Sequence, residues 1–542
     1  MSSKHGHGIL SRLAFAGGLS LLAACGADYE LDLQPLIPQN QSPFADLDAL
    51  DLVLEQADGS NIRHSLDSTT GSPNISDLGL LNGTRLRLDG MKNNQVVMTG
   101  RTAGLNLDSG SAAHNIFVSE VNQMAWLEDH EHGLFGTSLV STEEGRFYAF
   151  GGIDLKSLNN EGKKGKKIFE LDLGNPLNPL VFEEVGEMPA YLGGSETATS
   201  EVTARHGASA TLLTHGPHTG KILVAGGSPR LLQSENITAS AFLYDPQSGA
   251  LESLGAGQEM DTGHYLHQAV RDATGNVVVL GGWEPTDPGF IAMNNRFDFF
   301  DASTGQFDQK ITDRTLLGAG MSGMAAPLGT AGVVHCGGAV IRSGSEWESR
   351  DECTLITTSG TISDEIPPMP APLSHGSMIA LSSSELLVVG GVSTPSGQPV
   401  GELSPAEDAV FYYDHLSQAW QALDGLQLAR ADAGLGLLPD GRVAIIGGRQ
   451  QAHLFDYSAN SEGEVLACVE IYDPNVALNQ PAKAASILQN GCTSSQETSD
   501  LPNRLHSMAT AQDSDHGLLV VGGINADGST PAVLHWRFAP TN

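Results

Sequence analysis

Cationic and aromatic residues are scarce in this chain of 542 residues. It holds 28 Lys and Arg against 63 Asp and Glu, a formal net charge of −35, and aromatic residues make up 6% of it. Nucleic-acid binding depends on Lys and Arg that neutralise phosphates and release counterions, so we expect no nucleic-acid partner. An acidic surface instead favours a soluble protein, and we expect a monomer.

Long apolar runs are also absent, because no stretch after residue 25 approaches the roughly 18 apolar residues that a membrane helix needs. The run Leu13 to Ala24 is too short to span a bilayer, and Lys4 and Arg12 precede it. A basic start, a short apolar stretch and small residues at its end are typical of a secretory signal. Residues 1–24 are therefore predicted to be a signal peptide.

The signal ends in Leu22-Ala23-Ala24-Cys25-Gly26, which resembles the lipobox of bacterial lipoproteins. The resemblance implies cleavage before Cys25 and lipid attachment, palmitate included, at that residue. Two or three acyl chains hold a protein firmly on a membrane. In enteric lipoproteins an Asp after the Cys retains the protein in the inner membrane, and Gly26 therefore favours the outer membrane. The alternative is an ordinary signal peptide with a coincidental Cys.

Glycine, by contrast, is abundant at 64 residues, and it recurs in pairs that each end a short apolar run. The seven pairs begin at Gly151, Gly226, Gly281, Gly337, Gly390, Gly447 and Gly522. Four of the six steps between them fall at 53 to 57 residues, and the other two are 75 residues long. Such a regular step indicates a repeat architecture with short strands and many turns.

The rest of each unit fits the same repeat. About twenty residues after most pairs, an apolar run ends in Asp, as in Tyr244-Asp245-Pro246 and Tyr413-Asp414, and Trp420 follows the latter. These features resemble kelch repeats, which fold as four-stranded blades of a β-propeller, as in the galactose-oxidase central domain. The resemblance predicts an all-β protein with a seven-bladed kelch-type β-propeller over residues 122–542.

The last unit predicts how the ring closes. It has three strands and then the chain stops, so its fourth strand is missing. The apolar segment Met124 to Leu127, just before the first unit, is expected to supply that strand by pairing with Val533 to Phe538. An unpaired edge and an open ring would otherwise remain.

Two regions precede the propeller. Residues 25–44 contain Pro35, Pro38 and Pro43 among polar residues and are predicted to be a tether. Residues 45–121 alternate apolar and polar positions between turns such as Asp89-Gly90, which predicts a small β-sandwich domain.

Four cysteines remain besides Cys25. Their number is even and the predicted compartment is oxidising, so disulfides are expected. Three connectivities are possible for Cys336, Cys353, Cys468 and Cys492. We predict Cys336 with Cys353 and Cys468 with Cys492, because under the blade interpretation only this pairing joins neighbouring strands.

In a kelch blade the first strand lines the axis, so its start and the residues after Gly-Gly meet on one rim. Loops on such a rim vary freely, and ligands usually bind there. The candidate ligand-binding residues of this rim are Arg205, Arg230, Trp283, Glu284, Arg342 and Arg449. Arginine forks suit carboxylates or phosphates, and Trp283 could stack on a sugar ring. The alternative is that these residues pair with neighbouring acids and hold the blades together.

The same rim carries His132, His206, His267, His375 and His506 near first-strand starts. Kelch repeats often place a structural, hydrogen-bonding His there, whereas metal ligands must lie within about 2 Å of one point. We therefore predict no metal site and no cofactor.

Two functions of different class are consistent with this sequence. The first is a non-enzymatic binding or scaffold module, anchored by lipid outside the cytoplasm, for an extracellular protein or glycan. The alternative is a carbohydrate enzyme on the same scaffold, similar to sialate mutarotases or, with less support, to copper oxidases. The oxidases cross-link a Tyr to a Cys, and here the four other cysteines are expected in disulfides. No catalytic residue is assigned.

Overall fold

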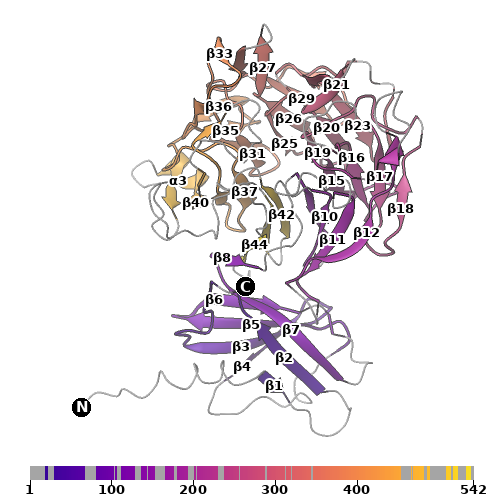
Figure 1. The fold of residues 1–542 in the computed structure, drawn as a ribbon. Helices are drawn as coiled ribbons and strands as arrows, with labels where there is room; N and C mark the ends of the chain where they lie inside the picture. The colour runs from indigo at the N-terminus through magenta and orange to yellow at the C-terminus, as the bar shows by residue number, and fades with distance from the viewer. Residues whose placement is uncertain are drawn as a thin grey trace.

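In the computed structural model, the residues described are 19–21, 30–38, 40–66, 81–102, 104–105, 111–127, 136–142, 145–152, 165–175, 180–192, 201–202, 204–229, 237–255, 257–286, 290–309, 311, 313–318, 320–342, 346–452, 465–466, 468–480, 485–488, 508–513, 517–522 and 533–538. These residues are almost entirely in strands and turns (Figure 1). A short helix, α3 (Pro474–Asn479), is present as well, capped at its N-terminus by the Asp473 side chain. None of the described helices is long and apolar enough to cross a membrane.

Seven four-stranded antiparallel sheets account for most of the described residues. The first four sheets are β9 (Ser138–Ser141), β10 (Arg146–Phe150), β11 (Lys167–Asp172) and β12 (Glu183–Glu187); β15 (Ser209–Leu212), β16 (Ile222–Ala225), β17 (Ala241–Tyr244) and β18 (Leu251–Ser253); β19 (Gln268–Arg271), β20 (Val277–Leu280), β23 (Phe297–Asp301) and β24 (Gln306–Phe307); and β25 (Met324–Leu328), β26 (Gly332–Cys336), β29 (Cys353–Thr357) and β30 (Ile362–Ser363). In each sheet the strands lie side by side in chain order or its reverse.

The remaining three sheets follow the same plan. They are β31 (Ser377–Ala380), β32 (Glu385–Val389), β35 (Val410–Asp414) and β36 (Ala419–Ala422); β37 (Gly434–Leu437), β38 (Val443–Ile446), β40 (Val469–Tyr472) and β41 (Ser486–Leu488); and β42 (Ala509–Asp513), β43 (Gly517–Val521), β44 (Val533–Trp536) and β8 (Met124–Trp126). The loops between second and third strands form two hairpins, β21 (Trp283–Thr286) with β22 (Phe290–Met293) and β27 (Ala339–Arg342) with β28 (Glu346–Ser349). Two further pairings join the loops of neighbouring sheets: β33 (Gln398–Pro399) with β28, and β34 (Ser404–Pro405) with β39 (Gln451–Ala452). A further pair is β13 (Tyr191–Leu192) with β14 (Glu201–Val202).

The seven sheets follow one another in a closed cycle. First strands of successive sheets contact each other, and β42 of the last sheet contacts β9 of the first. Apolar clusters fill the spaces between sheets, so that one cluster joins β10 and β11 to β16 and β17, and another joins β43 and β44 back to β10 and β11. Second strands such as β16 and β20 are buried throughout because a sheet covers each face. This arrangement is consistent with the predicted β-propeller.

Two strands from opposite ends of the propeller region, β8 and β44, close this cycle. Strand β8 pairs antiparallel with β44, so that Met124 lies opposite Trp536 and Trp126 opposite Leu534. The Leu127 N–H also donates to the Val533 carbonyl at 3.0 Å. The expected pairing of Met124 to Leu127 with the C-terminal strand is therefore confirmed, and Figure 1 shows β8 beside β44.

The glycine pairs are the junctions between neighbouring sheets. A Cβ on Gly281 would lie 2.0 Å from the carbonyl oxygen of Gly320 in the next sheet, so only glycine fits there. That same carbonyl accepts a hydrogen bond from the N–H of Gly282 at 3.0 Å. A Cβ on Gly151 would likewise lie 1.8 Å from the carbonyl oxygen of Arg205. The repeated pair therefore marks the place where two backbones touch and bond.

The cysteines agree with the predicted pairing as far as the described residues reach. Cys336 and Cys353 lie opposite each other in β26 and β29 and form a disulfide. Cys468 is disulfide-bonded as well. Its predicted partner Cys492 and the predicted lipidation residue Cys25 lie outside the described residues.

The region before the propeller consists of strands, as predicted for residues 45–121. Its strands are β1 (Leu19–Leu21), β2 (Glu30–Leu36), β3 (Ala49–Glu55), β4 (Asn61–Ser65), β5 (Arg85–Lys92), β6 (Gln95–Arg101) and β7 (Ser111–Glu120). They are hydrogen-bonded in the order β1-β2-β7-β6-β5-β3-β4. Strand β7 links two groups of strands, because it pairs with β2 along residues 111–117 and with β6 along residues 118–120. The two-sheet sandwich stays a prediction.

The predicted tether is wrong over residues 30–36, which form β2 and pair in parallel with β7. Proline lacks the N–H that a sheet ladder needs and is confined to edge positions within sheets. Pro35, however, lies beyond the segment Leu31 to Leu33 that pairs with β1, so the outer edge of β2 needs no donor at that point. A proline is tolerated at such an edge position.

The N-terminal sheet is also docked onto the propeller. The guanidinium of Arg537 donates to the Phe117 carbonyl at 3.1 Å and lies over the Phe117 ring at 5.0 Å. Phe117 itself is fully buried among side chains of the first and last propeller sheets. The Asn40 amide donates to the Met124 carbonyl at 2.8 Å and accepts from the Trp126 N–H. The sheet therefore covers the seam where the ring closes.

A buried histidine in the fourth sheet makes stability depend on pH. His335 of β26 has no solvent exposure, and burial lowers its pKa to about 4. An unfolded chain would bind the proton near pH 6.5, so stability is fully present above that pH and is lost as the pH falls toward 4. At pH 5 the loss attributable to His335 is about 2 kcal/mol.

We therefore expect unfolding in urea to show a smaller drop in stability between pH 7.5 and pH 5 for His335→Leu than for the natural chain. The difference between the two drops should be about 2 kcal/mol. His215→Gln, at an exposed position, serves as the control and should follow the natural chain. Equal drops for His335→Leu and the natural chain would contradict the assignment.

Candidate ligand site on the propeller axis

In the first six sheets, the residue two positions before the first strand has an unusual backbone conformation. These residues, which we call mouth residues, are Gly136, Gly207, Leu266, Ser322, His375 and Asp432, and their φ angles all lie between +50° and +65°. A non-glycine residue in this left-handed region is uncommon and costs roughly 1–2 kcal/mol. Four such residues at equivalent places mark a constraint that the surrounding structure imposes.

Backbone hydrogen bonds link the mouth residues around the axis. The Gly207 N–H donates to the Gly136 carbonyl at 2.7 Å, and the Leu266 N–H donates to Gly207 at 2.8 Å. On the other side of the ring, His375 donates to Ser322 and Asp432 donates to His375. The left-handed turn thus presents each carbonyl to the next sheet, which joins neighbouring sheets at the mouth of the axis.

A second set of hydrogen bonds is donated by side chains at the first residues of the first strands. The Ser377 hydroxyl donates to the Ala433 carbonyl at 2.8 Å, and the Gln268 amide donates to the Gly323 carbonyl at 3.0 Å. Each joins the beginning of one first strand to the next sheet. Together the two sets give the mouth a fixed shape.

The mouth residues and their neighbours enclose a cavity of about 330 Å³. Its polar lining comprises Thr137, His267, Gln268, Ser322, His375, Ser377, Asp432 and Arg449, and its apolar lining includes Leu266, Trp283, Met321 and Met508. The lining comes from all seven sheets or their connecting loops. A concave site with mixed lining on the axis is a suitable place for a small ligand.

Three charged or titratable side chains in the cavity form a chain of contacts. The Arg449 guanidinium bonds to Asp432 Oδ2 through Nε at 2.7 Å and Nη2 at 2.6 Å. The other carboxylate oxygen of Asp432 lies 3.1 Å from Nδ1 of His375. The Asp432 carboxylate neutralises the charge of Arg449. These three linked side chains therefore carry no net charge while His375 is neutral.

The second imidazole of the cavity belongs to His267. Its Nε2 lies 2.9 Å from the Ser209 hydroxyl. Burial, together with the neighbouring His264, lowers the pKa of His267 well below its ordinary value, so this ring is neutral at pH 7. It therefore adds polarity to the cavity without adding charge.

The predicted rim residues separate into two groups. Trp283 and Arg449 both line the cavity, but Trp283 is only 2% exposed and packs among apolar side chains beneath it. Little of Trp283 is therefore accessible, and its stacking on a sugar ring stays a prediction.

Arg205 does not belong to the rim surface. It is 2% exposed and donates to the Gly226 carbonyl at 2.9 Å and to the Ser240 carbonyl and hydroxyl. The alternative interpretation, that arginines here hold the propeller together, fits Arg205.

The other predicted rim residues lie away from the cavity lining. Arg342 of β27 is exposed and forms an ion pair with Glu348 at 2.6 Å. Glu284 is half-buried on β21, and burial raises its pKa. Arg230 lies outside the described residues.

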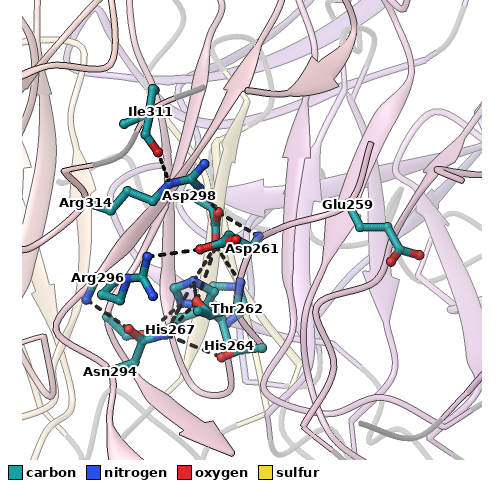
Figure 2. A network of polar contacts seen from close by, with 12 residues as sticks. Glu259, Asp261, Thr262, His264, His267, Asn294, Arg296, Asp298, Ile311 and Arg314 are labelled. Carbon is teal, nitrogen blue, oxygen red and sulfur yellow. Dashed lines mark hydrogen bonds and ion pairs between the residues drawn. The ribbon is translucent and has the colours of Figure 1, made fainter. Parts of the chain in front are cut away.

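A buried polar network, which sequence reasoning missed, supports the third sheet (Figure 2). His264 bonds through Nε2 to Asp298 at 3.0 Å and through Nδ1 to the Gly281 carbonyl at 2.9 Å. Arg314 bonds to the other oxygen of Asp298. Burial alone would raise the pKa of Asp298, but these partners hold it below its ordinary value.

In the sixth sheet, the position equivalent to His264 holds an arginine. Arg430 occupies the place of His264 and Arg205 before its first strand, and it forms a fully buried ion pair with Glu470 at 2.6 Å. Glu470 and Asp298 occupy equivalent positions in the third strands of their sheets. An acid in a third strand matched to a His or Arg four residues before the first strand of the same unit is the signal that could have found these pairs.

The histidines proposed near first-strand starts do not occupy one ring of equivalent positions. His375 is a mouth residue, whereas His206 precedes and His267 follows the mouth residue of its own unit. His132 and His506 lie outside the described residues. Within the described part of the chain, no group of three His, Cys, Asp or Glu is placed to hold a metal.

The sheets, their closed cycle and the axial cavity together define the class of this protein as a β-propeller-like all-β protein. Over 109 residues the chain is 30% identical to an F-box/kelch-repeat protein of Arabidopsis thaliana, which covers 20% of this chain. The match spans 25% of the length of that relative. No family model matches the chain.

A solved structure described as "Structure of YjhT" is similar to this chain with a TM-score of 0.42 and 12% identity. The similarity covers 75% of this chain and 95% of that one. A TM-score of this size carries no argument about the cavity, so the function has to be inferred from the residues that line it.

Proposed function

We propose that this protein is a binding module: a lipid-anchored, extracytoplasmic kelch-type propeller that presents its axial cavity to a protein or glycan ligand without catalysing a reaction. The observation that carries the proposal is the cavity itself. Its lining combines a neutralised chain of Arg449, Asp432 and His375 with apolar walls on a rigid, hydrogen-bonded mouth. Rigid scaffolds with variable loops on one rim commonly serve recognition.

The seven-bladed form of this proposal is supported by three features. Seven four-stranded sheets are present among the described residues, first strands contact one another in a closed cycle, and β8 supplies the outer strand of the last sheet. The regular step of the glycine pairs supports kelch repeats, because five of them, beginning at Gly151, Gly226, Gly281, Gly337 and Gly390, lie against a backbone carbonyl of the next sheet.

The anchoring part of the proposal depends on the lipobox-like sequence Leu22 to Cys25. Cys25 would carry the lipid and hold the protein on the outer membrane, with the propeller outside the cytoplasm. Two or more acyl chains are needed for stable anchoring, which a lipoprotein N-terminus supplies.

One experiment tests both parts. The natural chain and Cys25→Ser are expressed in a Gram-negative host, and we expect fatty-acid labelling and membrane association of the natural chain alone. Both purified chains are then applied to a glycan array and to a panel of extracellular proteins, where we expect the same ligand for each. Labelling of Cys25→Ser would refute the anchor, and absence of any ligand would refute the binding role.

An enzyme acting on carbohydrate is the second candidate, and the His375–Asp432 pair is the observation that favours it. An imidazole held at Nδ1 by a carboxylate can serve as a general base. A bound glycan whose NMR spectrum changes with time only in the presence of protein would support this candidate. The copper-oxidase variant has less support, since Cys336 and Cys353 are joined in a disulfide and are not available for a cross-link to Tyr.

A further inference from the structure

We propose that His264 is a buried imidazolium whose proton acts as a pH-sensitive switch for the mouth of the axial cavity. The proton holds the third sheet's part of the mouth in place near neutral pH, and its loss at alkaline pH releases that part. The proposal concerns the conformation of the mouth, so it is independent of the proposed binding function.

The charge of His264 follows from the two atoms that face its ring nitrogens (Figure 2). Nδ1 lies 2.9 Å from the Gly281 carbonyl oxygen, and Nε2 lies 3.0 Å from Oδ2 of Asp298. A carbonyl and an ionised carboxylate can only accept, so both ring nitrogens must donate. Among the forms of the ring, the doubly protonated, positively charged imidazolium has two donors.

Asp298 is ionised because other donors surround it as well. Arg314 bonds to its Oδ1, and the Asp261 N–H donates to the same oxygen at 2.9 Å. Burial alone would raise the pKa of this carboxyl, yet its partners hold the pKa below its ordinary value. The proton between Asp298 and Nε2 therefore belongs to His264.

The neighbouring amide of Asn294 does not replace either ring proton. Its Oδ1 accepts from the Arg296 N–H at 2.9 Å, which fixes the orientation of the amide. Its Nδ2 lies 3.1 Å from Nδ1 and 3.5 Å from Nε2 of His264. A donor aimed along the lone pair of one ring nitrogen would lie much farther from the other, so this amide is aimed at neither.

The other charged and titratable groups around His264 come from several elements. They are Asp261, His267, Glu284, Arg296, Asp298 and Arg314, with Arg205 on the second sheet. Arg296 pairs with Asp261 at 3.0 Å, and Arg205 donates to backbone and hydroxyl oxygens of its own sheet. These two arginines are therefore bonded elsewhere and leave Asp298 to Arg314 and His264.

Two nearby groups respond to the charge of His264. The ring of His267, which lines the cavity, lies 5.5 Å from the ring of His264. Burial and the neighbouring positive charge lower the pKa of His267, so that ring stays neutral. Burial raises the pKa of Glu284 on β21, and the charge of His264 acts against that rise.

The sixth sheet holds a permanent cation at the equivalent place. Arg430 donates to the first glycine carbonyl of its own unit and to Glu470, as His264 donates to Gly281 and Asp298. An arginine keeps its charge at any pH of interest, whereas a histidine can lose a proton. The third sheet can therefore change with pH at a position where the sixth sheet cannot.

Loss of the proton should loosen the mouth because His264 belongs to the segment that forms it. A neutral ring turns a lone pair toward either the Gly281 carbonyl or Asp298, which sets two acceptors against each other in a fully buried site. The backbone carbonyl of His264 accepts from the Gly227 N–H of the second sheet at 2.7 Å, and the mouth residue Leu266 follows two positions later. An unfolded chain gives up this proton near pH 6.5, so the stabilisation is fully present below that pH and is lost as the pH rises.

Nitrogen NMR of the purified full chain, ¹⁵N-labelled at histidine, tests the charge. At pH 7.5 we expect both ring nitrogens of His264 to resonate as protonated nitrogens, assigned by the signals that disappear in His264→Gln. The exposed His215 is the control and should show a neutral ring. A neutral His264 ring at pH 7.5 would overturn the proposal.

Hydrogen exchange in the natural chain tests the switch without any variant. The Gly227 and Gly391 amides make equivalent bonds, to the carbonyls of His264 and Arg430 at 2.7 Å and 2.8 Å. Between pH 7 and pH 10 we expect the protection factor of the Gly227 amide to fall at least tenfold, and that of the Gly391 amide to change less than threefold. Equal changes at the two amides, whether large or absent, would show that the proton of His264 does not control the mouth.

Discussion

Replacing Glu470 with Ala should lower the free energy of unfolding by about 3–5 kcal/mol, because it leaves the Arg430 charge buried without its partner. Both side chains of this ion pair are fully buried, and Glu470 also accepts from the Gln427 N–H and the Ser486 hydroxyl. Urea unfolding at pH 7.5 measures the effect.

Two variants make this expectation specific. The double variant Arg430→Met with Glu470→Leu removes both charges and should recover much of the lost stability, since apolar replacement of a buried pair is often neutral. Glu252→Ala breaks an exposed ion pair with Lys221 and should cost about 1 kcal/mol or less. If Glu470→Ala costs no more than Glu252→Ala, the buried pair is not a stabilising element of the sixth sheet.

Replacing Phe117 with Ala should lower the free energy of unfolding by about 3–5 kcal/mol, the usual cost of removing a buried aromatic ring. Phe117 belongs to the N-terminal sheet but is buried among side chains of the first and last propeller sheets. Its loss also removes the ring beneath Arg537. We therefore expect the seam of the propeller to loosen along with the docked sheet.

Hydrogen exchange can show that the effect reaches the seam. The Leu127 and Asn122 amides, which bond to Val533 and Arg537, should exchange faster in Phe117→Ala. Phe44→Ala, within the apolar cluster of the N-terminal sheet, is the control and should leave these two amides unchanged. Unchanged exchange in Phe117→Ala would mean that the N-terminal sheet rests on the seam without stabilising it.

The ligand cavity shows why part of the site escaped sequence reasoning. Arg449 was singled out because it follows a glycine pair, and it does line the cavity. Its partner Asp432 lies 17 residues away in the same unit, and His375, which contacts Asp432, lies 57 residues before Asp432 in the preceding unit. Arg205, which precedes a first strand, was assigned to the same rim, but it turns inward to the Ser240 and Gly226 carbonyls.

The sequence by itself determined the repeat and its junctions. A backbone contact too close for any Cβ can only be made by glycine, so such junctions leave visible pairs such as Gly281-Gly282. The incomplete last unit likewise required an outer strand from elsewhere, and β8 provides it. The Cys336–Cys353 disulfide followed from the same register of strands.

Only the tertiary structure decided where side chains point and how the N-terminal region packs. Pro35 was compatible with a tether or with an edge position of a strand, and pairing with β7 settled it. Leu266, Ser322, His375 and Asp432 share no residue type, yet all adopt the left-handed conformation, because carbonyl bonding between sheets imposes it. Such long-range backbone constraints leave no pattern in local composition, so the mouth of the axis could not be predicted from the sequence alone.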